Sequence, residues 1–197
     1  MGFPVFNEMD YIGLNGTSRK QLLHPHFERC HKWFITEYRA PRDKIALFLP
    51  CAAIKPYYNS PIHKIINQRI ADYNDRIHKI VISNAGVIPY EYCNKYPFDS
   101  YDWNPLAEDK AIQKEYYKVT KKRIKEYLLK HQYKSYISYL RTSSISHKAL
   151  KDACKEIGIK LHHPILNEQI QSDKDSDLIL IYDENLQELI KALRGLI

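Results

Sequence analysis

Four short, largely apolar runs stand out along the chain, each bounded by charged or turn-forming residues. Their length and composition are typical of strands that are buried on both faces of a sheet. The runs cover residues 45–49, 77–82, 135–140 and 178–182. Elsewhere, apolar residues recur three or four positions apart, which predicts amphipathic helices. These helices lie at about residues 25–38, 61–73, 109–131, 144–158 and 183–193.

Several helix starts carry capping signals. Ser60 directly precedes Pro61, and a serine before a proline is a favourable start for a helix. Ser144 or Ser146 can cap the fourth helix, and Asp183 can cap the last one. Because strands and helices alternate, the sequence predicts an α/β fold with a parallel sheet that helices cover on both faces.

The chain divides into an irregular lead-in over residues 1–21 and a single α/β domain over residues 22–197. In parallel sheets, ligands bind where the loops leave the carboxyl ends of the strands. The loops that matter most for function are therefore those at residues 50–60, 83–105 and 141–146.

Charge is distributed unevenly along the chain, which has a formal net charge of +7. Residues 110–151 contain twelve Lys or Arg and only two acids, whereas residues 166–190 contain seven acids and a single lysine. A basic segment of this kind can bind a polyanion. The equally good alternative is the solvated face of a lysine-rich helix.

Composition excludes several classes of protein. Apolar residues make up 44% of the chain, which is enough for a core, and no run reaches the roughly 20 apolar residues of a membrane helix. The N-terminus does not resemble a signal peptide, so we expect a cytoplasmic protein without a membrane partner. The four cysteines contain no CxxC pair, so we expect free thiols rather than a disulfide framework.

Cys51 is the strongest candidate nucleophile, because it directly follows the first predicted strand and lies four residues before Lys55. A nearby ammonium lowers the pKa of a thiol and favours the reactive thiolate. The alternative is that Cys51 is a small buried residue that packs beneath the loop.

The segment Lys55-Pro56-Tyr57-Tyr58 combines one charge with two aromatic rings, a combination that suits a phosphate and a stacked base. His63 is a candidate acid, base or phosphate donor, or else an ordinary surface histidine. Asp99 and Asp102 supply carboxylates, although Asp in a tyrosine-rich loop of this kind more often forms turns.

Several common kinds of site are missing from the sequence. No histidine or cysteine cluster has metal-ligand spacing, and there is no GxxxxGK[ST], GxGxxG or GxSxG motif. Nucleoside triphosphate hydrolysis, dinucleotide binding and serine-hydrolase chemistry are therefore disfavoured. We expect neither a cofactor nor a metal.

Two stretches of the chain have a characteristic spacing of residues. The first stretch is Pro50-Cys51-x-x-x-Lys55-Pro56-Tyr57-x-x-Ser60-x-x-His63. The second is Gly86-Val87-Ile88-Pro89-x-Glu91, followed by Tyr96-Pro97 and Tyr101-Asp102. In this order, and each after a predicted strand, the two stretches resemble the core domain of archaeosine synthase, a paralogue of archaeal tRNA-guanine transglycosylase.

This resemblance implies a three-layer α/β/α fold like that of uracil-DNA glycosylase, with a four-stranded parallel sheet. It also implies archaeosine biosynthesis in archaeal tRNA, in which lysine adds to the nitrile of 7-cyano-7-deazaguanine at tRNA position 15. The candidate catalytic residues are then Cys51, Lys55, His63 and Asp102. The candidate substrate-binding residues are Pro50, Tyr57, Ser60, Asn84, Gly86, Pro89, Glu91 and Tyr101. The candidate contacts to the nucleic-acid backbone are Lys118, Lys121, Lys122, Arg123 and Lys125.

The chain also departs from the family pattern. Ala52 and Ile62 stand where the family has serines, and the family's larger members carry further transglycosylase-like and RNA-binding domains. We therefore expect tRNA as a partner, with a separate RNA-binding or transglycosylase-like subunit as a second one. A catalytically altered relative is the alternative.

Three functions remain open. The first is a tRNA-modifying enzyme, either alone or as a catalytic subunit. The second is a non-catalytic module that binds nucleic acid or a nucleotide, which the loss of the two serines favours. The third, base excision from DNA, follows from the fold alone and is weak, because the chain has no Gly-Gln-Asp-Pro-Tyr-type loop after its first strand.

Overall fold

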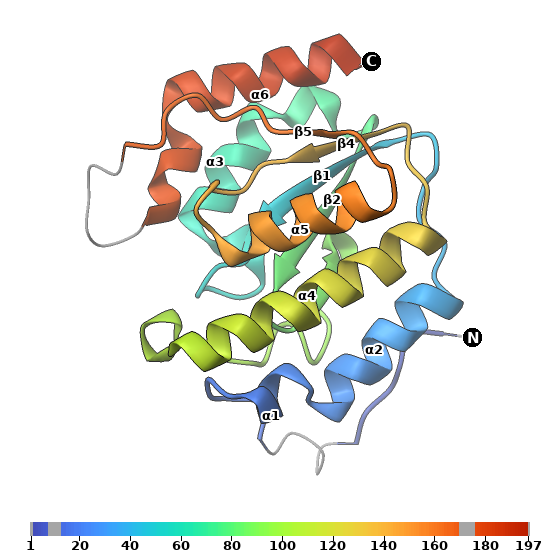
Figure 1. Cartoon of the computed structure of the whole chain (residues 1–197). Helices are drawn as coiled ribbons and strands as arrows, with labels where there is room; N and C mark the ends of the chain where they lie inside the picture. The colour runs from blue at the N-terminus through green and yellow to red at the C-terminus, as the bar shows by residue number, and fades with distance from the viewer. Residues whose placement is uncertain (1, 8–12, 170–175, 197) are drawn as a thin grey trace.

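The structure is a computed structural model, and it describes residues 2–7, 13–169 and 176–196 (Figure 1). Its centre is a mixed five-stranded sheet with the order β3-β2-β1-β4-β5. The strands are β1 (Ile45–Pro50), β2 (Ile77–Ser83), β3 (Gly86–Pro89), β4 (Ser135–Ser138) and β5 (Leu161–His162). β1 pairs in parallel with both β2 and β4, β5 is parallel to β4, and β3 is antiparallel to β2.

Helices cover both faces of the sheet, as the sequence predicts (Figure 1). The helices are α1 (Arg19–Leu22), α2 (Pro25–Thr36), α3 (Pro61–Arg69), α4 (Lys110–Lys130), α5 (Ile145–Glu156) and α6 (Asp183–Leu196). α4 packs against α5, α2 and α1 on one face, and α3 packs against α6 on the other. The α/β class is thus confirmed.

The expectation of four parallel strands is wrong in two respects. The sheet has five strands, and β3 runs antiparallel because a tight hairpin returns the chain directly from β2. The predicted strand at residues 178–182 is instead part of a 3₁₀ helix, Ser176–Ile181. Side chains satisfy its carbonyls in place of a strand partner: Tyr139 donates to the carbonyl of Leu180 at 2.7 Å, and Asn185 donates to that of Ile179 at 2.8 Å.

β1 lies at the centre of the core, which explains its continuous apolar run. All six of its residues are buried, because β2 and β4 flank it and helices cover both of its faces. Since β1, β2 and β4 are parallel, their ends define two opposite edges of the sheet. We call the edge where these strands finish the carboxyl edge and the opposite one the amino edge.

Described residues near the N-terminus pack against the rest of the chain. Leu14 is buried in the core, and the ring of Phe3 stacks on Tyr92 with 5.0 Å between centroids. The side chain of Asn15 accepts a hydrogen bond from the backbone of Asp102 at 2.8 Å. Within the part of the chain that the structure describes, no helix is long and apolar enough to cross a bilayer.

Candidate functional site

The two motif stretches meet at the carboxyl edge of the sheet. The hydroxyl oxygens of Tyr57, from the first stretch, and Tyr101, from the second, lie 2.6 Å apart and form a buried hydrogen bond. Burial raises the pKa of both phenols, so both stay neutral. The pair fixes the loop after β1 against the segment that follows β3. The peptide bonds before Pro56 and Pro97 are both cis.

Lys55 lies over this tyrosine pair. Its Nζ is 4.2 Å from the centroid of the Tyr101 ring, a cation–π distance, and 3.4 Å from the carbonyl oxygen of Ala53. Burial lowers the pKa of Lys55, and nearby Cys51 and Asp102 oppose this shift. The amine is thus half-buried and more readily deprotonated than an exposed lysine.

Cys51 is half-buried beside this lysine. Burial raises the pKa of its thiol to about 11, the carboxylate of Asp177 adds to the rise, and Lys55 opposes it. The expectation that Lys55 makes Cys51 a thiolate is therefore not met, because burial outweighs the ammonium. At neutral pH Cys51 is a thiol, which can donate a proton or a weak hydrogen bond.

Sequence reasoning missed several polar groups that surround Cys51. Glu108, like Asp177, raises the pKa of its thiol, and Cys51 in turn raises the pKa of the buried Tyr116 phenol, which burial raises most. Burial raises the pKa of Glu108, whose carboxylate accepts a hydrogen bond from Trp103 at 2.7 Å. Asp177 forms an ion pair with Arg141. Of these groups, Arg141 lies in the loop at residues 141–146, which the predicted sheet topology indicated as a functional loop.

His63 is buried, and both of its ring nitrogens form hydrogen bonds. Nε2 donates to the carbonyl oxygen of Pro50 at 2.9 Å, and Nδ1 accepts from the Tyr90 hydroxyl at 3.1 Å. Burial lowers the pKa of His63 to about 4, and Lys79 lowers it further against the effect of the Pro50 carbonyl. The ring is therefore neutral, and it ties the end of β1 to α3 and to the turn after β3.

Other predicted substrate-binding residues hold the backbone in place. The Ser60 hydroxyl accepts from the backbone N–H of His63 at 3.3 Å and so caps α3. Asn84 is buried in the hairpin between β2 and β3, and Gly86 there has a φ of 145°, in the region that favours glycine. These residues shape the carboxyl edge from within the fold.

Glu91 and Pro89 do not join this group. Pro89 pairs with Ile80 in the middle of β2, so Glu91 lies toward the amino edge. The Glu91 carboxylate contacts Nε2 of His78 at 3.2 Å and accepts from the hydroxyl of Tyr38. Although burial favours the neutral acid, these hydrogen bonds lower the pKa of Glu91. Glu91 is thus part of a separate polar network.

Asp102 lies next to the lysine–tyrosine group but is exposed. Its backbone is held by Asn15 and by Gly16, whose N–H donates to the Asp102 carbonyl at 3.2 Å. Its carboxylate influences Lys55 from the solvent side. Asp99 accepts a hydrogen bond from the hydroxyl of neighbouring Ser100 at 2.6 Å, as expected for a turn.

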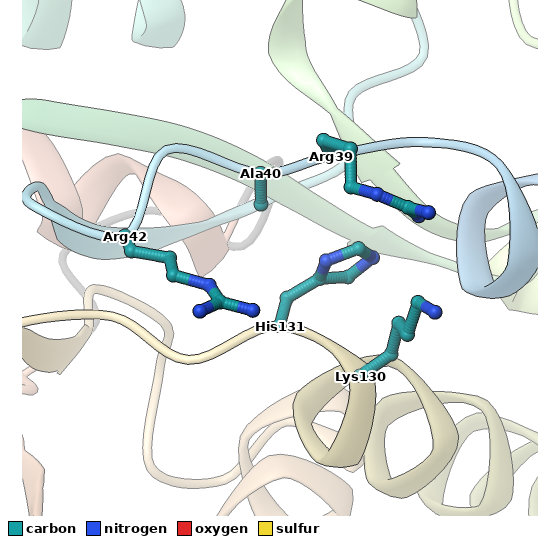
Figure 2. A pocket seen from close by; sticks show the side chains of 5 residues that line it. All are labelled: Arg39, Ala40, Arg42, Lys130 and His131. Atoms are coloured by element: carbon teal, nitrogen blue, oxygen red, sulfur yellow. The ribbon is translucent and has the colours of Figure 1, made fainter.

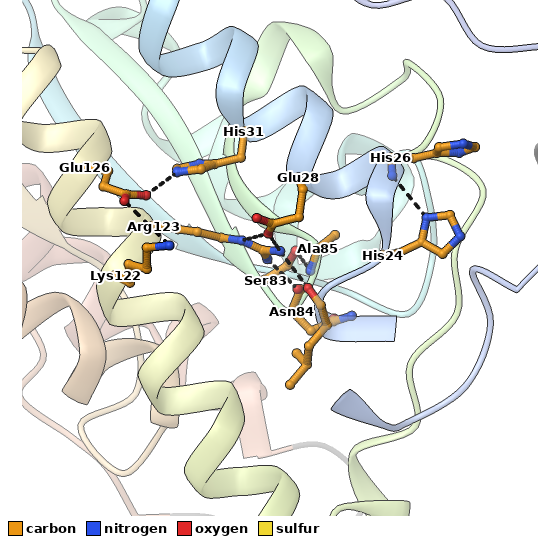
Figure 3. A network of polar contacts seen from close by, with 11 residues as sticks. His24, His26, Glu28, His31, Ser83, Asn84, Ala85, Lys122, Arg123 and Glu126 are labelled. Atoms are coloured by element: carbon orange, nitrogen blue, oxygen red, sulfur yellow. Dashed lines mark hydrogen bonds and ion pairs between the residues drawn. The ribbon is translucent and has the colours of Figure 1, made fainter. Parts of the chain in front are cut away.

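Arg123 is buried inside the fold rather than on the basic surface of α4 (Figure 3). Its guanidinium donates to the carbonyl of Asn84 at 3.1 Å and forms an ion pair with Glu28. It also donates to the carbonyl of Leu22 at 2.6 Å. With a side chain that is only 2% exposed, Arg123 does not reach a phosphate on the surface. It joins α4 to the hairpin of the carboxyl edge.

The other basic candidates on α4 are paired with acids. Glu156 of α5 accepts from Lys121 at 2.7 Å and from Lys125 at 3.2 Å. Lys118 pairs with Glu115 at 3.2 Å, and Lys122 lies 3.8 Å from Glu126 (Figure 3). The surplus positive charge of this segment is therefore partly neutralised within the fold. Among the described residues, no group of three His, Cys, Asp or Glu could hold a metal ion.

Comparison with protein families identifies the chain. Residues 27–178, well over half of its length, match the family described as a domain of unknown function, DUF5591. The chain belongs to this family. Both motif stretches, and the Tyr57–Tyr101 contact that joins them, lie inside the matched residues.

This DUF5591 chain is similar to two curated proteins. The archaeosine synthase subunit alpha of Thermoplasma acidophilum is 27% identical over 142 residues, which are 70% of this chain and 26% of that protein. The archaeosine synthase subunit alpha of Methanosarcina acetivorans is 29% identical over 129 residues, which are 64% of this chain and 19% of that protein. The chain thus spans about a quarter or less of the length of these relatives.

One solved structure has a similar fold. The crystal structure of AF0587, a protein of unknown function, superimposes with a TM-score of 0.57 at 17% sequence identity. The similarity covers 83% of this chain and 48% of that one. At this identity the match concerns the fold alone.

Proposed function

We propose that the chain takes part in archaeosine formation in tRNA and binds the nitrile-bearing base at the carboxyl edge of its sheet. The observation that carries the proposal is the meeting of the two motif stretches through Tyr57 and Tyr101, with Lys55 and Cys51 beside them. The names of the two curated relatives support the pathway, and both motif stretches lie within the family match.

The proposed reaction adds the amine of lysine to the nitrile of 7-cyano-7-deazaguanine at position 15 of tRNA. The amine nitrogen forms a bond to the nitrile carbon, and one π bond of the nitrile breaks. The nitrile nitrogen takes up a proton, and the attacking nitrogen loses one, which leaves an amidine. Atoms and charge balance without an oxidant or a cofactor.

The proposed roles follow from the protonation states at the site. The Cys51 thiol has a raised pKa and can donate a hydrogen bond to the nitrile nitrogen. Lys55 has a lowered pKa, so it can lose and regain a proton near neutral pH more easily than an exposed lysine can. Asp102 would orient the incoming amine from the solvent side, and the aromatic rings of the loop would stack on the base.

The direct test supplies purified protein with tRNA that carries the cyano base and with radiolabelled lysine, and it measures label in tRNA. Incorporation by the wild-type chain that is lost in Lys55→Ala supports the catalytic role. Lys64→Ala is the matched control, because Lys64 is exposed on α3 and contributes nothing to the group around Cys51. Incorporation that survives in Lys55→Ala would contradict the role of Lys55.

A non-catalytic binding module on the same fold is the second candidate. The raised thiol pKa of Cys51 and the full hydrogen bonding of His63 favour it, since neither group is activated for chemistry. The same assay separates the two functions, because a binding module retains tRNA without incorporating label. The chain would then act beside a separate catalytic subunit, consistent with the word subunit in the relatives' names.

We further propose that residues 22–197 form one α/β domain with a core like that of uracil-DNA glycosylase. The lead-in packs onto this domain through Phe3 and Leu14. Lys118, Lys121, Lys122 and Lys125 stay proposed contacts to the RNA backbone, whereas buried Arg123 leaves that set. Glu91 and Pro89 leave the proposed base pocket, because they lie toward the other edge of the sheet.

A further inference from the structure

A second concave site lies at the amino edge of the sheet, at the opposite end from Cys51. It is a cavity of about 220 Å³ between the loop that enters β1 and the end of α4. Its lining residues are Arg39, Ala40, Arg42, Lys130 and His131. Figure 2 shows the arginine and lysine side chains around the His131 ring. Three of these five residues thus carry a permanent positive charge, and none of the described residues that line the cavity is an acid.

These cations differ in their pairing from the lysines farther along α4 toward its start. Within the described residues, neither Arg42 nor Lys130 takes part in an ion pair, whereas Lys121 and Lys125 share Glu156. Arg39 donates from one terminal nitrogen to the carbonyls of Thr36 and Tyr38, both at 3.1 Å. Its other N–H groups remain available, since a guanidinium has five donors.

His131 forms the floor of the cavity. Its Nε2 donates to the carbonyl oxygen of Phe34 at 2.8 Å, which leaves Nδ1 as the ring's second polar atom. Burial lowers the pKa of His131, and the charges of Lys130 and Arg39 lower it further against the effect of the Phe34 carbonyl. Burial is the main cause of this shift, and the two neighbouring cations act in the same direction, so an anion in the cavity would reduce the repulsion among the positive charges.

The same edge carries further cations at the strand starts. Lys44 and Arg76 precede β1 and β2, and the N–H of Ile45 donates to the carbonyl of Arg76 at 2.9 Å. Asp43 and Asp75 are the acids beside them in the chain. Glu91 also lies toward this edge, so the edge as a whole carries both signs of charge, and the cations are gathered at the cavity.

We propose that this cavity binds a phosphate group of an RNA backbone, a proposal that rests on the tRNA-related function above. Guanidinium groups match phosphate oxygens with paired N–H donors, and a lysine adds a point charge. β1 separates the two sites, and a strand of six residues is roughly 20 Å long at about 3.3 Å per residue. A small ligand cannot reach both sites, whereas an RNA with one base at Cys51 can extend its backbone to the amino edge.

The test measures tRNA affinity against salt concentration for wild type and for the double variant Arg42→Gln/Lys130→Gln. The matched control is Arg19→Gln/Lys20→Gln, which removes the same charge from α1, close to the start of α4. Losing the contact to one phosphate should reduce the slope of log K against log salt by roughly 0.7 to 0.9, and should weaken binding about fivefold or more at 0.1 M salt. The control should keep the wild-type slope.

The outcomes separate this proposal from the function on which it rests. If wild type binds tRNA and the Arg42→Gln/Lys130→Gln variant binds with the same slope, the cavity is not a backbone site and the tRNA function stands. If wild type fails to bind tRNA, both fall. A second arm titrates inorganic phosphate alone and follows His131 by NMR. Saturation by phosphate without any loss of tRNA affinity in the variant would identify a site for free phosphate and overturn the RNA assignment.

Discussion

At the scale of single residues, the carboxyl edge is built from neutral groups held by burial. Cys51 stays a thiol, His63 stays a neutral imidazole, and the phenols of Tyr57 and Tyr101 stay protonated. Lys55 is the group whose lowered pKa brings proton exchange closer to neutral pH. Of the groups named here, Lys55 is therefore the one that would exchange a proton most readily with a bound base.

The neutral histidines make stability depend on pH. Burial lowers the pKa of His63 and of His147 from 6.5 to about 4 each. Below about pH 6.5 the unfolded chain takes up protons that the folded protein excludes, so the free energy of unfolding falls as pH drops toward 4. Each histidine contributes up to about 1.4 kcal/mol per pH unit. Urea denaturation of His63→Gln between pH 7 and 4 should show a shallower dependence than wild type, and an unchanged dependence would refute the assignment.

Arg123 supplies a second test at this scale. Its removal leaves the Glu28 carboxylate and the carbonyls of Leu22 and Asn84 without their donor. Because the Glu28 side chain is 45% exposed, water can solvate its carboxylate, and the cost comes mainly from the two buried carbonyls. Arg123→Met should therefore destabilise the fold by about 1–3 kcal/mol in chemical denaturation. Lys122→Met, one position earlier and 71% exposed, should change stability by less than about 0.5 kcal/mol. Equal effects of the two changes would contradict the structural role of Arg123.

The sequence identified Cys51, Lys55, Tyr57 and Tyr101 as neighbours through their motifs, and the structure brings them together. The prediction that Arg123 contacts the nucleic-acid backbone was wrong, because a run of charges along a helix does not indicate which cation is buried. The prediction that Glu91 binds the substrate with the other motif residues was also wrong, because β3 runs antiparallel to β2 and places Glu91 toward the amino edge. The burial of Arg123 arises from long-range packing, whereas the position of Glu91 follows from the tight hairpin between β2 and β3.

At the scale of elements, capping serine signals located α3 and α5 correctly. Ser60 and Ser144 accept from the backbone N–H groups of His63 and His147 at 3.3 and 3.1 Å. The apolar run at residues 178–182 was misread, because a short apolar segment fits a strand and a buried helical turn equally well. β5 has only two residues and β3 only four, too short for a periodic signal.

Ser60 caps α3 and is also a proposed substrate-binding residue, and a single substitution separates these two roles. Ser60→Ala removes the cap of α3 and should cost about 1 kcal/mol in urea denaturation. Asn59→Ala, at the exposed neighbouring position, should cost much less. If Ser60 acts only as a cap, tRNA affinity of the folded variant stays at the wild-type value. A large loss of affinity at full folding would instead show that its hydroxyl contacts the substrate.

At the scale of the whole molecule, the two edges of the sheet have different chemistry. The carboxyl edge gathers aromatic rings, one thiol and one half-buried amine, whereas the amino edge holds the cationic cavity. α4 connects the two edges, and Arg123 near its middle anchors it to the carboxyl-edge hairpin. This difference is the basis of the proposal that one edge binds a base and the other a backbone phosphate.

The most direct measurement compares two otherwise identical tRNAs, one with 7-cyano-7-deazaguanine and one with guanine at position 15, in competition for the purified chain. If the group around Cys51 and Lys55 recognises the nitrile base, the cyano tRNA binds more tightly. That preference should disappear in Lys55→Ala and persist in Lys64→Ala, whatever the catalytic competence of the chain. Equal affinity of the two tRNAs for the wild-type chain would contradict the account.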